Sequence, residues 1–186
     1  MMVGMINTNR TKWLSVLCIA SMASMALLKG CKREEAPPSG SSPRASLPPD
    51  FFADKEPPGA KSVEEAKKSA KVGETMTIRG RVGGSKEPFV EGRAIFTIMG
   101  PGIKPCGADS PMPECKTPWD YCCELPEDIA AHSAVIQVVD AGGSPLRLSL
   151  RGQHKVMELS ELVVVGRVKQ IEKNLLVINA TKIFVH

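Results

Sequence analysis

Four of the six cysteines fall in one segment that is rich in proline and lacks regular alternation, residues 100–132. They are Cys106, Cys115, Cys122 and Cys123. In an exported protein, four such cysteines predict two disulfides. A bond between the neighbours Cys122 and Cys123 would close a strained ring, so we expect Cys106 and Cys115 to pair with Cys122 and Cys123, in an order that stays open. Each bond would stabilise the segment by about 2–4 kcal/mol.

A metal site is the alternative interpretation of the same segment. Thiolates of Cys106, Cys115, Cys122 and Cys123, with the imidazole of His132, would be soft ligands for a metal ion. The spacing argues against this, because eight residues separate the first two cysteines, six separate the next two, and no C-x2-C hook is present. A thiol-redox role is a third interpretation, although the segment has no thioredoxin-like C-x-x-C.

Motifs of other chemistry are not found. The sequence has no G-x-G-x-x-G, no phosphate-binding loop and no G-x-S-x-G. His132 and Ser133 are sequence neighbours, and neighbours rarely meet as a catalytic dyad. We therefore expect a protein that is not an enzyme and that has no cofactor.

The N-terminus has the layout of an export signal. Arg10 and Lys12 precede an apolar run of 16 residues from Trp13 to Leu28, which is shorter than the ~20 residues of a membrane-spanning helix. We expect residues 1–30 to be a signal peptide.

The end of this run resembles a bacterial lipobox. It reads Leu28-Lys29-Gly30-Cys31, with Lys29 where the family pattern has a small residue. The resemblance implies that Cys31 is lipidated, and ordinary signal-peptidase cleavage after Ala26 is the alternative. Residues 31–60 are rich in proline, serine and glycine, so we expect a disordered tether between a membrane anchor and a folded domain at 61–186.

Removal of the signal changes the charge of the protein. The full chain has a net charge of +4, but residues 1–30 hold three basic residues and no acidic residue. From Val72 onward, 13 basic residues balance 13 acidic residues. The folded part is therefore neutral, and we expect no nucleic-acid ligand, because single-strand binding needs a positive groove and several stacking aromatic residues.

The rest of the chain predicts an all-β domain with one or two short helices. Ser62 to Glu65 fits a capping box that begins a helix over 63–71, and 153–159 is a candidate second helix. Alternating segments predict strands near 76–82, 94–99, 162–168 and 175–183, with a hairpin formed by 134–140 and 145–150. Gly80 and Gly166 sit late in two of these strands, where glycine often marks a bend.

This strand order and glycine placement resemble the OB-fold, a small barrel of five to six strands here interrupted by a Cys-rich insertion at 100–132. The whole chain resembles bacterial cell-envelope lipoproteins. The OB-fold resemblance places a ligand at Arg93, Phe96, Trp119 and Tyr121, although the two residues beside the cysteines can instead pack over a disulfide. These observations predict an exported, membrane-anchored binding or scaffolding module for a protein or glycan, with a metal-handling or thiol-redox protein as the alternative.

Overall fold

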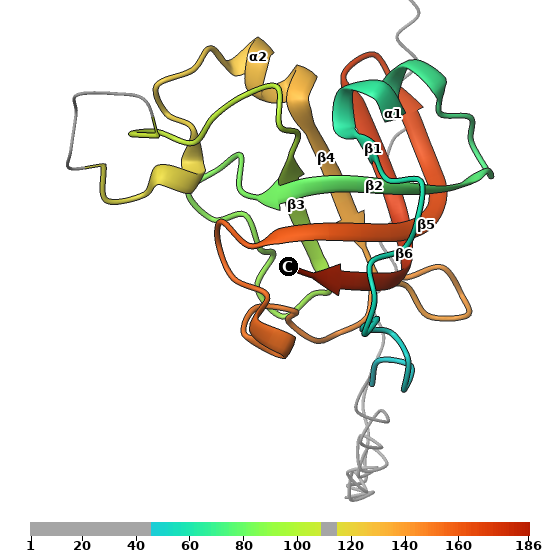
Figure 1. The fold of residues 1–186 in the computed structure, drawn as a ribbon. Coiled ribbons are helices and arrows are strands. Elements are labelled where there is room, and N and C mark those ends of the chain that lie inside the picture. Colours follow the sequence, from blue (N-terminus) through green and yellow to red (C-terminus); the bar gives the residue numbers. More distant parts are fainter. Residues whose placement is uncertain (1–45, 109–114) are drawn as a thin grey trace, which may run out of the picture. The chain divides into compact units, whose positions relative to one another are not determined.

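The computed structural model describes residues 46–108 and 115–186. In this part of the chain the fold is mostly β-sheet, with six strands and two short α-helices (Figure 1). The expected signal peptide and Cys31 lie outside the described residues. No helix among the described residues has the length and apolar character needed to cross a membrane.

Five strands close into a ring. They are β2 (Thr75–Val82), β3 (Ile95–Met99), β4 (Ser133–Gln137), β5 (Glu161–Glu172) and β6 (Leu175–Val185). The order is β2-β3-β4-β6-β5, and β5 pairs back onto β2. Strands β4 and β6 are parallel, while the other pairs in the ring are antiparallel. The short β1 (Lys61–Ser62) adds to β2 in parallel.

The alternating apolar side chains of these strands fill the inside of the ring. Ile78, Phe96, Ile136, Val164 and Ile178 come from five different strands and have no exposed surface. This confirms the strands that period-two alternation predicted. The segment 145–150 forms no named strand and contributes one isolated bridge, between Val139 and Pro145.

The core also takes residues that the sequence placed in the tether. Phe51 is 1% exposed, and the amide of Ile183 donates to its carbonyl at 2.8 Å. Phe52 forms a bridge to Ile183. The folded part therefore begins before residue 61, because an aromatic pair inside the Pro-rich segment is apolar enough to pack on β6.

Gly166 allows β5 and β6 to approach closely. A Cβ atom at this position would lie 2.5 Å from the Asn179 carbonyl oxygen and 2.5 Å from Ile178 Cγ2. The pairing register shifts between Val165 and Gly166, as in a β-bulge. The glycine inside the alternating strand thus marks an irregularity, as the sequence predicted.

The helices differ in part from the predictions. Helix α1 (Val63–Ser69) begins at the Ser62–Glu65 capping box, with both reciprocal hydrogen bonds present. Residues 153–159 hold only the 3-10 turn η2 (Gln153–Lys155) instead of a helix. The insertion contains helix α2 (Pro126–His132), which the sequence analysis missed because its proline and small residues give no clear apolar period.

Helix α1 fixes the base of the insertion. The Lys67 ammonium donates to the Ala130 carbonyl at 2.6 Å and to the Asn174 carbonyl at 2.5 Å. Burial lowers the pKa of Lys67, and the nearby Glu64 carboxylate opposes this effect. Glu64 also accepts a hydrogen bond from the Gly102 amide at 3.2 Å. One short helix therefore connects both ends of the insertion to the β-sheet.

We expect Lys67→Met to lower the free energy of unfolding by about 1–3 kcal/mol, because two carbonyl groups lose a charged donor. Lys68→Met is the matched control, since Lys68 lies on the same helix and is exposed. Urea unfolding of both variants checks the prediction. Equal stability of the two variants would contradict it.

Candidate metal centre

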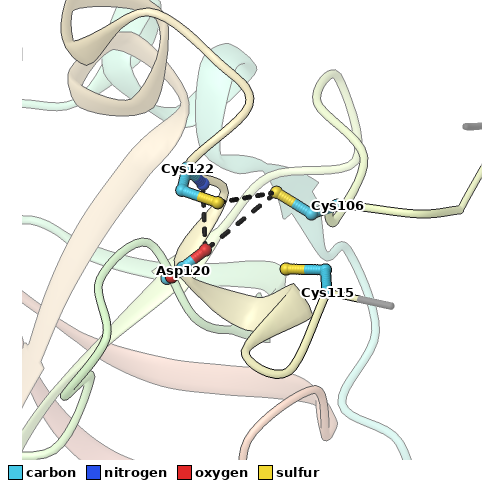
Figure 2. Close-up of side chains that lie close together, drawn as sticks. All are labelled: Cys106, Cys115, Asp120 and Cys122. Atoms are coloured by element: carbon cyan, nitrogen blue, oxygen red, sulfur yellow. Dashed lines mark hydrogen bonds between the residues drawn. The ribbon is translucent and has the colours of Figure 1, made fainter. Parts of the chain in front are cut away.

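The insertion brings three of its four cysteines together with one carboxylate. One ligand atom from each of Cys106, Cys115, Asp120 and Cys122 lies within 4.8 Å of all the others. Figure 2 shows the three sulfur atoms and the Asp120 carboxylate facing a common centre. We call these four residues the thiol cluster.

The distances in the thiol cluster suit a tetrahedral ion. The Sγ atoms of Cys106 and Cys122 are 3.7 Å apart, and Cys106 Sγ is 4.0 Å from Asp120 Oδ1. With Zn–S bonds of ~2.3 Å and a Zn–O bond of ~2.1 Å, tetrahedral geometry places two sulfur ligands about 3.8 Å apart and a sulfur and an oxygen ligand about 3.6 Å apart. The observed pairs are therefore close to the edges of a zinc site.

Tyr121 positions two of the four groups. Its backbone is left-handed, with φ 56°, and its side chain has no exposed surface. The ring packs with Met99 and Ile103 in a small second core, with Ile129 of α2 against it. Because Tyr121 points into the protein, its neighbours Asp120 and Cys122 are both available to the thiol cluster.

Neighbouring groups orient the Asp120 carboxylate. It accepts hydrogen bonds from the Thr117 hydroxyl at 2.7 Å and from the Cys122 amide at 2.9 Å. Burial acts to raise the pKa of Asp120, but these hydrogen bonds and the positive charge of Lys86 outweigh it, so the pKa is lowered overall. A carboxylate that is held ionised beside thiols favours a cation at this position.

The sulfur atom of Cys106 is the central acceptor of the thiol cluster. The Cys123 amide donates to it at 3.3 Å. Burial acts to raise the pKa of Cys106, but the hydrogen bonds from Cys123 and Cys122 outweigh it and the pKa is lowered. The hydrogen bonds of Cys122 to Asp120 and Cys106 raise the pKa of Cys122, so its proton stays on the sulfur at neutral pH.

The predicted disulfides are not formed in the structure. All four cysteines of the insertion are free thiols, and the 3.7 Å between Cys106 and Cys122 exceeds a disulfide bond of ~2.0 Å. The pairing of these cysteines in the oxidised protein stays a prediction.

The ligands differ in part from the set that the sequence suggested. Cys106, Cys115 and Cys122 belong to the thiol cluster, whereas Cys123 and His132 do not. The Nε2 atom of His132 lies 3.9 Å from Glu64 Oε1, at the base of the insertion. Asp120, which the sequence analysis did not single out as a ligand, is the fourth member. Its position two residues before Cys122 was the available signal.

The four predicted ligand-binding residues do not form one exposed surface. Phe96 lies in the core of the ring and Tyr121 in the second core, so neither ring is exposed. Trp119 is half-buried, and its indole nitrogen donates to the Lys86 carbonyl at 3.1 Å. Arg93 is exposed on the connection between β2 and β3. The two aromatic residues beside the cysteines therefore hold the insertion in place.

No family model matches the chain, and the comparisons with curated proteins and with solved structures find no significant similarity.

Proposed function

We propose that this protein is an exported module, tethered to a membrane through Cys31, that binds a soft divalent metal ion at the thiol cluster. The observation that carries the metal-binding role is the convergence of three sulfur ligands and one carboxylate within 4.8 Å. Thiolate-rich sites select zinc and similar soft ions. The ring of five strands supports an OB-like scaffold, on which the insertion between β3 and β4 is the binding element.

The pairing of three arginine residues of the sheet argues against a nucleic-acid ligand. Arg79 is paired with Glu56, and Arg81 is paired with Glu161. The Arg167 guanidinium donates to the Gly73 carbonyl at 2.6 Å. Because these charges are used within the protein, the sheet has no free basic stripe at these three positions for a phosphate backbone.

Native mass spectrometry of the full chain with Zn²⁺ tests the proposal. We expect the reduced protein to bind one zinc ion and to contain no disulfide. The three cysteines of the thiol cluster would be ligands, and Cys123 would be a free thiol. A mature protein that is four hydrogens lighter than the reduced chain and carries no metal would support a loop closed by two disulfides instead. Failure of the reduced chain to take up zinc would contradict the metal-binding proposal.

Zinc affinity should fall as the pH is lowered. A thiol must lose its proton to bind zinc. Because the pKa of Cys122 is raised, this thiol is protonated in the metal-free protein at neutral pH, and zinc binding must release at least this one proton. Each displaced proton changes the apparent affinity by about tenfold per pH unit. We therefore expect at least a tenfold loss between pH 8 and pH 7, measured by chelator competition at constant ionic strength. An affinity that is unchanged over this range would contradict thiolate ligation.

The membrane anchor is tested separately. When cells that express the full chain are fed a fatty-acid probe, we expect label on the wild-type protein and none on Cys31→Ala. Cys18→Ala, in the apolar run of the signal, is the matched control and should keep the label. A labelled Cys31→Ala protein would exclude the lipid anchor at this residue without changing the metal-binding proposal.

A further inference from the structure

We propose that the thiol cluster also reacts with external disulfides, so that oxidation of Cys106 and Cys122 to a disulfide releases the bound metal. This inference rests on the proposed metal-binding function, since the released ion is the one held by the same sulfur atoms. The substrate class is a small organic disulfide of the glutathione type or an equivalent exposed protein disulfide.

The closeness of two sulfur atoms supports this reaction. Cys106 Sγ and Cys122 Sγ are 3.7 Å apart, so they must approach by about 1.7 Å to reach the ~2.0 Å of a disulfide bond. Cys106 follows β3 in the connection that leads to η1 (Pro118–Asp120), and Cys122 lies in the turn after η1. Neither residue lies in a strand or α-helix, so sheet and α-helix hydrogen bonds do not fix these two side chains.

The different exposure of the two cysteines assigns their roles. Cys122 is exposed, whereas Cys106 is 7% exposed. An external disulfide therefore meets Cys122 first, and Cys106 reacts only within the protein, as the resolving thiol. An open hollow of about 550 Å³ borders the buried partner and is lined by Cys106, Cys123, Lys104 and His132 among others.

The reaction balances in two steps. In the zinc-loaded protein the metal ion has displaced the Cys122 proton, so the Cys122 thiolate attacks one sulfur of the disulfide R–S–S–R, which forms a mixed disulfide and expels the first R–S⁻. The Cys106 thiolate then attacks Cys122 Sγ, which forms the Cys106–Cys122 bond and expels the second R–S⁻. Two electrons pass from the two protein sulfurs to the external disulfide. The divalent ion loses two of its four ligands and leaves as M²⁺.

The test follows zinc and mass together. The zinc-loaded full chain is mixed with oxidised glutathione and a chromogenic chelator, and the product is mapped by non-reducing peptide mass spectrometry. We expect release of one zinc ion for every two glutathione thiols formed, with a peptide that links Cys106 to Cys122. Retention of zinc would overturn the proposal, as would release with a link to Cys115 or Cys123 or with a lasting mixed disulfide.

Two serine variants of the reduced, metal-free chain test the roles without depending on zinc, at a pH well above neutral so that part of the Cys122 thiol is ionised. Cys106→Ser should stop at a mixed disulfide on Cys122, because the resolving thiol is missing. Cys123→Ser, the matched exposed neighbour, should still form the Cys106–Cys122 bond. Complete resolution in Cys106→Ser would overturn the assignment. If the reduced wild type binds no zinc, the proposed function fails, and the mapped disulfide still decides whether the exchange step occurs.

Discussion

Replacement of Cys106 by serine should lower the affinity for zinc by at least about 100-fold, which corresponds to about 2.7 kcal/mol. Cys106 is the buried member of the thiol cluster, and its sulfur contacts both Cys122 Sγ and Asp120 Oδ1. A serine hydroxyl is a poor zinc ligand and stays protonated at neutral pH. The loss is measured by competition with a chromogenic chelator under reducing conditions.

Substitution of the other members of the thiol cluster should lower zinc affinity by the same factor as Cys106→Ser or by a smaller one. We expect a similar loss for Cys115→Ser and Cys122→Ser, and a loss of about tenfold for Asp120→Asn, which keeps an oxygen but loses the charge. Asp120→Asn also distinguishes the metal-binding role of Asp120 from its role in the turn. The asparagine side-chain oxygen can still accept the hydrogen bond from the Cys122 amide, so the turn is kept while the negative charge is lost. The four variants together test whether the ligand set is three sulfurs and one oxygen.

Cys123→Ser is the control for this series. Cys123 is exposed and lies outside the thiol cluster, and its contribution to Cys106 includes the backbone amide, which the substitution leaves in place. We expect its zinc affinity to stay within about threefold of the wild type. A loss as large as that of Cys106→Ser would instead indicate that Cys123 is a ligand and would contradict the role of Asp120.

The largest expected effect on stability comes from Gly166→Val. The added Cβ would lie 2.5 Å from the Asn179 carbonyl oxygen, which is backbone and cannot turn away. Ile178 Cγ2, on a residue with no exposed surface, is equally close. We expect the free energy of unfolding to fall by at least about 2–4 kcal/mol, in the range of the larger single-residue effects that overpacking produces. Urea unfolding followed by circular dichroism measures the change.

Gly142→Ala is the matched control for Gly166→Val. Gly142 lies in the exposed turn before Pro145, and a Cβ there would meet only the flexible Asp140 carboxylate, at 3.2 Å. Its effect should stay within about 0.5 kcal/mol, as for most surface substitutions. If Gly166→Val were as stable as this control, then β5 and β6 would not pack as closely as the structure shows.

The strands were predictable because their signal is local. Each strand of the ring alternates inward and outward side chains, and this period can be read from a few residues, as in Met76 to Val82. The capping box at Ser62 and Glu65 is equally local, since its partners are three residues apart. Helix α2 was not predicted, because Ile129 is its one apolar contact with the second core. A single contact gives no repeating apolar pattern in the sequence.

The sequence by itself placed four cysteines in one insertion and predicted the alternating strands that support this insertion. Only the tertiary structure decided which side chains meet there. Asp120 joins the thiol cluster and His132 does not, because burial of Tyr121 and its left-handed backbone turn Asp120 toward the sulfurs, while α1 holds His132 near Glu64. Such convergence depends on packing between segments far apart in the chain, and spacing alone does not encode it.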